Sequence, residues 1–150
     1  MPLTRSTFDT GVVTALVDRI RAYLEGLGDD CRAKVVAQWE PDVQELPLVV
    51  VSCTELEEVV YQSGHYRVAL DVTLKANPAM EGFLSLSGAL LDALQQVDLT
   101  AQLNAVLDPT GRAYCVVQGI VLEQSRLEDV ADWQLRRVYA LNLFGHAPLS

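Results

Sequence analysis

Two histidines and three cysteines are the residues whose types could ligate a metal or act as a nucleophile. His65 follows Ser63-Gly64 and His146 lies near the C-terminus, and neither has a second His or Cys at the spacing of a zinc site. Cys31, Cys53 and Cys115 show no C-x-x-C spacing, and the last two lie in strand patterns, where Cys behaves as a small buried apolar residue. The sequence therefore predicts no metal site. Only tertiary structure could bring a Cys and a His together as a nucleophile pair.

Paired carboxylates are the next candidates for chemistry, and they occur in Glu55-Leu56-Glu57-Glu58. Strand alternation places Glu55 and Glu57 on one side, but no partner for general acid–base work accompanies them. We interpret them as a solvated strand edge that deters non-specific pairing. Gly26-Leu27-Gly28 lacks a third glycine and follows a helical pattern, which is typical of a helix C-terminus and not of a phosphate loop. We expect no catalytic residue, no cofactor and no enzymatic activity.

One further group could serve an interface. Trp133-Gln134-Leu135-Arg136-Arg137 begins the last predicted strand. We interpret Trp133 as a core residue at the end of a sheet. One of the two arginines must project from the side opposite an apolar neighbour, and Arg is frequent at interface anchors.

The elements that position these residues begin with an amphipathic helix. Its apolar residues recur at helical spacing from Val12 to Leu27; Asp9 or Thr10 can cap its start and Gly28 can end it. Residues 29–45 fit either a short helix or a strand, ended by Pro41. A second helix is expected to open at Asn77-Pro78, with a stripe of Met80, Phe83, Leu84, Ser87, Leu90, Leu91 and Leu94. A shorter helix follows Asp98, with a stripe of Leu99, Leu103, Val106 and Leu107, before the turn Asp108-Pro109-Thr110-Gly111.

Strands are expected over 48–53, 57–62, 66–76, 113–123 and 133–144. The second and third form a hairpin about Ser63-Gly64, and 66–76 alternates strictly, so one face should be core and the other wet or in contact with a partner. The polar segment 125–132 looks too long for a tight hairpin. Together these predictions give a single α+β domain over residues 1–150. Its sheet is mainly antiparallel, with four to five strands and two or three helices packed on it.

Charge and length limit the functional classes. The chain has 150 residues, 11 basic and 20 acidic, for a net charge of −9, so it should repel a phosphate backbone. Acid is concentrated in residues 41–60: Asp42, Glu45, Glu55, Glu57 and Glu58. Apolar runs such as Leu48–Val51 are far shorter than the roughly 18 residues of a membrane span. The start MPLTRSTFDT lacks the pattern of a signal peptide, so we expect a cytosolic product.

The order of elements resembles a known family across nearly the whole chain. The residues that carry the resemblance are the N-terminal amphipathic helix, Leu46-Pro47-Leu48-Val49-Val50-Val51, the alternating run from Gly64 to Val72, the Leu-rich helix and Asp132-Trp133-Gln134. This pattern is similar to the tail terminator, or tail completion, proteins of long-tailed bacteriophages. The resemblance implies a structural virion protein, assembled in the host cytoplasm. In that family a hexameric ring caps the head-proximal end of the tail tube, stops its growth and meets the neck protein.

The expected strands also provide surfaces from which several copies of the chain could form a ring. Exposed sheet edges and long hairpins can close one, and we expect 55–76 and 133–144 to supply the contacts. An acidic lumen lined by 41–60 would let DNA pass without specific binding. Two alternatives remain: a neck or stopper ring protein of the head–tail joint, and a small α+β enzyme or ligand-binding domain.

Overall fold

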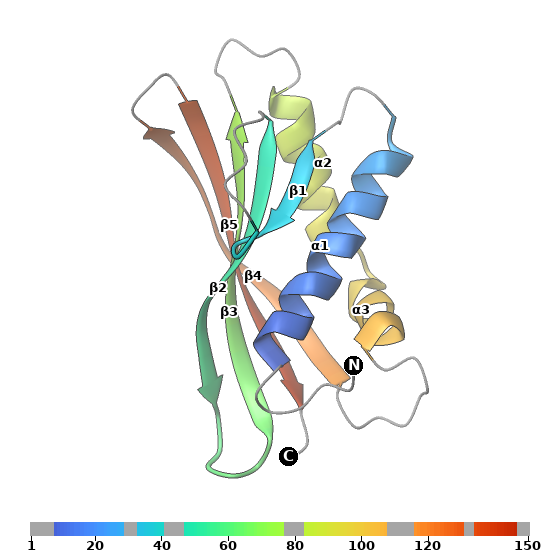
Figure 1. Ribbon diagram of the computed structural model, residues 1–150, viewed down its shortest axis with the longest axis vertical. Helices are drawn as coiled ribbons and strands as arrows, with labels where there is room; N and C mark the ends of the chain where they lie inside the picture. Colours follow the sequence, from blue (N-terminus) through green and yellow to red (C-terminus); the bar gives the residue numbers. More distant parts are fainter. Residues whose placement is uncertain are drawn as a thin grey trace.

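The computed structural model describes residues 8–28, 33–40, 47–76, 83–107, 116–130 and 134–146 (Figure 1). Their elements follow the chain as α1 (Phe8–Gly26), β1 (Lys34–Ala37), β2 (Leu48–Glu58), β3 (His65–Ala76), α2 (Phe83–Leu94), α3 (Leu99–Leu107), β4 (Val116–Val130) and β5 (Gln134–His146). The predictions that concern Cys31, Asn77-Pro78, Met80, the turn at 108–111, Cys115 and Trp133 lie outside the described residues.

The strands form one five-stranded sheet in the order β1-β2-β3-β5-β4. Only the β1–β2 pair is parallel, and the other three pairs are antiparallel. The three helices lie on the same side of the sheet, where they cover its inner face (Figure 1). The predicted α+β class, with a mainly antiparallel sheet and helices on one face, is confirmed.

The strict alternation of side chains along β3 determines which of its residues lie in the hydrophobic core. Its inner face carries Tyr66, Val68, Leu70, Val72 and Leu74, all at most 3% exposed. The expected burial of this face is confirmed, but α2 does not cover it alone: Phe8 at the start of α1 lies against Tyr66, with 5.7 Å between ring centroids. The physical reason is length. A 12-residue strand spans about 40 Å while a 12-residue helix spans about 18 Å, so one helix of α2's length cannot cover it.

The hairpin differs from the sequence prediction. One continuous strand, β2, replaces the two predicted strands 48–53 and 57–62, and residues 59–64 form the turn. A bulge at Thr54 shifts the register between Cys53 and Glu55. Because the extra residue breaks the period of two, the pattern reads as two short strands. The turn itself has left-handed backbone at Gln62 and Gly64, with φ of 58° and 77°.

The prediction that the polar segment 125–132 is a loop between two strands is also wrong. Residues 125–130 belong to β4, where Ser125 pairs with Tyr139 and Arg126 with Val138. Here the backbone pairing with β5 holds the strand, and the side chains need not be apolar because β4 is the edge of the sheet. In the uncertain segment 29–45, the described part forms the strand β1, parallel to β2.

The predicted helical stripes are mostly confirmed. In α1 the predicted stripe is buried from Val12 to Leu24, except that Tyr23 is only partly buried. Its last predicted member, Leu27, is exposed because the helix ends at Gly26. The α2 stripe needs one correction: Leu84 is 80% exposed, and Leu86 takes the buried position because it lies three residues after Phe83 on the same helix face. In α3, Leu99 and Leu103 are buried while Val106 stays half exposed.

Candidate assembly interface

The described cysteine is not set up for catalysis. Cys53 is half-buried, and its thiol donates to the backbone carbonyl of Glu55 at 3.6 Å. Burial, and after it the charge of Asp9, raise the pKa of this thiol, so less of it is the nucleophilic thiolate at neutral pH. Cys53 pairs with Leu70, five residues along β3 from His65. Among the described residues, no group of three or more His, Cys, Asp or Glu could hold a metal ion.

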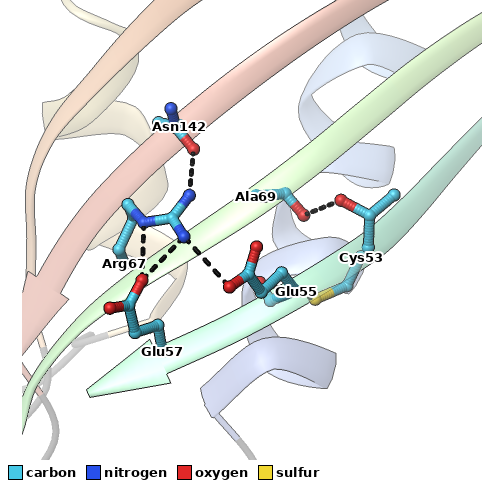
Figure 2. Close-up of polar contacts among 7 residues, drawn as sticks. Cys53, Glu55, Glu57, Arg67, Ala69 and Asn142 are labelled. Atoms are coloured by element: carbon cyan, nitrogen blue, oxygen red, sulfur yellow. Dashed lines mark hydrogen bonds and ion pairs between the residues drawn. The ribbon is translucent and has the colours of Figure 1, made fainter. Parts of the chain in front are cut away.

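The carboxylates Glu55 and Glu57 form an ion-pair network with Arg67 (Figure 2). Nη2 of Arg67 lies 2.7 Å from Oε2 of Glu57 and 3.2 Å from Oε1 of Glu55, and its Nη1 donates to Oδ1 of Asn142 at 3.0 Å. The hydrogen bond to Glu57, followed by that to Glu55, raises the pKa of the guanidinium. The network joins β2, β3 and β5 on the outer face of the sheet.

The expectation that Glu55 and Glu57 share one side is confirmed, but they do not stand as an unpaired solvated edge. The bulge at Thr54 sets Glu55 opposite Ala69 and Glu57 opposite Arg67. The sequence pattern did not indicate the Arg67 pair because a turn at Ser63-Gly64 would set Val60 opposite Arg67, whereas the longer turn over 59–64 sets Glu57 there.

The acidic segment 41–60 is therefore less uniform than its composition indicates. The carboxylate of Glu58 accepts the backbone N–H groups of Gln62 and Gly64, at 2.8 and 3.3 Å, and so closes the hairpin turn. Glu55 and Glu57 are occupied by Arg67. Asp42 and Glu45 lie outside the described residues.

Arg136 and Arg137 lie on opposite faces of β5, as neighbours in a strand must. Nη1 of Arg136 lies 3.9 Å from Oε2 of Glu128, which also pairs with Nε of Arg126 at 2.8 Å. Arg137 donates to the hydroxyl of Ser125 at 3.4 Å. Arg137 pairs with Leu74 of the inner face, while Arg136 and Glu128 lie on the outer face. The outer face thus carries charges of both signs, and none of the described helices covers it (Figure 1).

Among the described residues, the sheet ends at β4 on one side and, on the other, at the short β1 and at the part of β2 that extends beyond it. β4 is 15 residues long and has a partner, β5, on one side only. β2 pairs with β1 only from Leu48 to Val51. Just beyond this paired stretch of β2, the side chain of Gln38 accepts a hydrogen bond from the backbone N–H of Cys53. From Thr54 to Glu58 the outer edge of β2 has no strand beside it. Such rows of backbone donors and acceptors are ready templates for another chain.

Exposed apolar side chains lie beside these edges. The hairpin tip, which we define as Val59, Val60 and Tyr61, is more than half exposed at each residue, and Tyr61 is 83% exposed. Val121 and Leu127 of β4 are each 51% exposed. Buried contacts in an assembly are the ordinary reason for a chain to present apolar residues of this size along a sheet edge.

A groove of about 590 Å³ lies between α1 and α3. Its floor is made by the small residues of α1, and Trp39 and Val106, both about half exposed, line it as well. The hydroxyl of Thr14 donates to the backbone carbonyl of Thr10 at 2.8 Å, and no charged side chain lines the groove. The described residues that line it are Thr10, Gly11, Thr14, Ala15, Trp39, Val106 and Leu107. An apolar lining of this kind suits apolar contacts and not charged substrates.

Comparison with known proteins gives likenesses of different strength. No family model matches the chain, and no curated protein matches it. Two structures from Akkermansia muciniphila, one solved without its transmembrane region, align at 11% identity with TM-scores of 0.37 and 0.33, which are too low to indicate a shared fold. They cover 99% and 100% of this chain and 89% and 90% of theirs. In this protein, none of the described helices has the length and apolarity needed to cross a bilayer.

A stronger likeness is to a chain in the virion of a native gene transfer agent particle. The two chains align with a TM-score of 0.57 and 15% identity over 89% of this chain and 93% of the other. Nearly the whole of each chain takes part, so the similarity concerns the complete arrangement of sheet and helices. This protein shares the fold of a subunit of that virion.

Proposed function

We propose that the protein is a structural subunit of a bacteriophage or phage-like virion, and more specifically a tail terminator. Its single domain forms a ring, most simply a hexamer, on the head-proximal end of the tail tube, stops tube growth and meets the neck. The observation that carries the proposal is the fold shared with a gene transfer agent virion chain over 89% of this chain. The order of elements, which resembles tail terminators, supports the finer assignment. In keeping with the fold of a virion chain, we propose no enzymatic activity.

The open edges of β4 and of Thr54–Glu58 in β2 support a head-to-tail ring. They differ in length and in side chains, so an interface between them is heterologous, and heterologous contacts that close produce rings. We propose that β4 of one copy meets the Thr54–Glu58 edge of the next, with the hairpin tip and β5 adding contacts. Sheet pairing between copies satisfies backbone groups that water otherwise solvates.

The lumen of the proposed ring lets DNA pass without specific binding. With a net charge of −9, the subunit repels phosphate groups, and each ring multiplies this charge by its number of copies. The ring belongs to the virion, at the joint between tail and neck, and is assembled in the host cytoplasm.

The matched variants Val121→Lys and Val97→Lys test the ring. Val121 is half exposed on the β4 edge strand, while Val97 is fully exposed between α2 and α3, away from both edges. We expect Val121→Lys to abolish rings on tail tubes, and Val97→Lys to form them normally, in negative-stain images of purified protein mixed with tails. Circular dichroism checks that both variants fold.

Three results would count against the proposal. If rings form equally well with both variants, the β4 edge is not part of the interface between copies. Binding to filled heads in preference to tail tubes would favour the neck or stopper role. Tails of normal length in a phage that lacks the protein would refute the terminator role.

A further inference from the structure

The β3–β5 register brings the two histidines of the chain together. His65 at the start of β3 pairs directly with His146 at the end of β5. Their ring centroids are 4.9 Å apart, and the ring planes are inclined by 55°. Sequence spacing showed no ligand pair because 80 residues separate the two positions, and only strand pairing closes that distance.

The separation of the rings suits a shared metal ion. A metal–nitrogen distance of about 2.0–2.1 Å places an imidazole centroid roughly 3.2 Å from the metal, so two imidazoles on one ion have centroids about 4.5–5.2 Å apart at ordinary coordination angles. The observed 4.9 Å lies in this range. Directly opposed residues in an antiparallel pair also have Cβ atoms close enough for both side chains to reach one ion.

The surroundings leave both imidazoles accessible to a metal ion and keep the electrostatic repulsion of that ion small. His65 is exposed, and His146 is partly buried. The backbone of His65 is fixed from both sides: its carbonyl accepts the N–H of Val59 at 2.9 Å, and its N–H donates to the hydroxyl of Ser63 at 3.1 Å. The cation two residues further along β3, Arg67, is already paired with Glu55 and Glu57, so its repulsion of a metal ion is largely compensated.

We propose that His65 and His146 together bind one divalent transition-metal ion of the class that prefers imidazole, Zn²⁺, Ni²⁺ or Cu²⁺. No third ligand gathers with them among the described residues, so water completes the coordination. Such a two-imidazole site is exchangeable and weaker than a closed structural zinc site. By joining β3 to the end of β5, the ion favours the folded chain, in which alone the two rings are adjacent. The site does not depend on the proposed tail function.

The presence of only two histidines makes the test sharp, because imidazole ¹⁵N spectra report on this pair alone. We expect ZnCl₂ added to the full-length protein to shift both imidazole signals together, with one ion bound per chain. His65→Asn and His146→Asn should each weaken binding at least tenfold. Cys53→Ser and the exposed strand variant Gln118→Ala are the controls and should bind Zn²⁺ normally.

Thermal unfolding gives a second readout. Zn²⁺ at about 100 times its dissociation constant should raise the melting temperature by roughly 5–10 °C, and EDTA should reverse the shift. The proposal fails if only one ring responds, if two ions bind independently, if either single His variant binds as tightly as the wild type, or if Cys53→Ser abolishes binding. If a His variant does not fold, the number of Zn²⁺ ions bound per wild-type chain and the joint response of its two imidazoles still test the proposal.

Discussion

At the scale of single residues, burial divides side chains that look alike in the sequence. Leu70 and Leu127 both lie in strands, but Leu70 is 1% exposed in the core and Leu127 is 51% exposed on the edge strand. The difference arises from the position of each strand in the sheet. A Leu on the inner face of a central strand can be covered by the helices, whereas on the edge strand coverage depends on how far the helices reach.

Leu70→Ala should therefore lower the free energy of unfolding by about 2–5 kcal/mol, because it removes buried methyl groups and leaves a cavity. Leu127→Ala is the matched control, and we expect it to change stability by no more than about 0.5 kcal/mol. Urea denaturation of both variants measures the two values. Equal losses would mean that the register assigned to β3 is wrong.

Tyr139 shows how one buried polar group links a strand to a helix. Its hydroxyl donates to the backbone carbonyl of Ser87 in α2 at 2.8 Å, and its side chain is buried beneath that helix. Burial raises the pKa of this phenol, with a further contribution from Asp92, while Arg137 acts in the opposite direction. The folded state therefore holds the phenolic proton more tightly than the unfolded state.

Tyr139→Phe removes this bond and should cost about 0.5–1.5 kcal/mol at neutral pH. The pH dependence has a definite sign. Because the folded pKa is raised, the stability it contributes is present below about pH 10 and is lost as pH rises through the folded value. We expect wild-type protein to lose more stability between pH 9 and pH 11 than Tyr139→Phe. Parallel losses in urea melts across that range would contradict this account.

At the scale of elements, the bulge in β2 decides which residues meet Arg67. Two residues of β2, Thr54 and Glu55, occupy the place that one residue occupies in a regular strand, and the hydroxyl of Thr54 donates to the carbonyl of Ala69 at 3.2 Å. Beyond the bulge, Glu57 faces outward with Arg67 while Leu56 opposes Val68. A single extra residue therefore sets the face of every later side chain.

Two deletions test this interpretation. Deletion of Thr54 leaves the inward and outward assignment of Leu56 and Glu57 unchanged, so we expect the fold and the Glu57–Arg67 pair to persist, at a cost of about 1 kcal/mol for the lost hydrogen bond. Deletion of Leu56 turns the later residues to the wrong face and should cost much more. Denaturant melts compare the two. The bulge has no such role if Thr54 deletion is the more harmful.

At the scale of the whole molecule, the described helices cover one face of the sheet and leave the other face and the edges of the sheet open (Figure 1). In the part of the chain that the structure describes, strand edges without a neighbouring strand, half-exposed apolar side chains on β4 and an apolar hairpin tip remain uncovered. Assembly would cover them. The fold is shared with a chain of a gene transfer agent virion.

If the protein forms the proposed ring, its acidic residues should control DNA passage. Glu55 and Glu57 are unsuitable targets because their reversal also breaks the contacts of Arg67. Asp42→Lys combined with Glu45→Lys avoids that contact, and we expect intact rings but slower DNA passage, because each new cation can hold a phosphate. Electron microscopy checks the rings, and timed DNA ejection from assembled particles measures passage. Unchanged ejection would place these two residues away from the DNA path.

The sequence by itself determined the parts of the fold that depend on local period. Apolar residues at helical spacing identified α1, and strict alternation identified the inner face of β3, because burial on one face leaves a regular mark on the residues of that element. The predicted cap Asp98 marked the start of α3, but α1 begins at Phe8, before the predicted caps Asp9 and Thr10, because its first turn extends one residue further than the polar cap pattern indicated. The α+β class followed from the order of these elements.

Only the tertiary structure decided which distant residues meet. Strand pairing sets Arg67 beside Glu57 and Asn142, and His65 beside His146. Periodicity did not reveal the full length of two strands. In β2, one extra residue at the bulge breaks the alternation, and the outer half of β4 is polar because an edge strand needs no apolar face. Register and edge position arise from backbone hydrogen bonds between strands, and those bonds are made by the same groups in every residue, so the side-chain pattern of one strand does not record them.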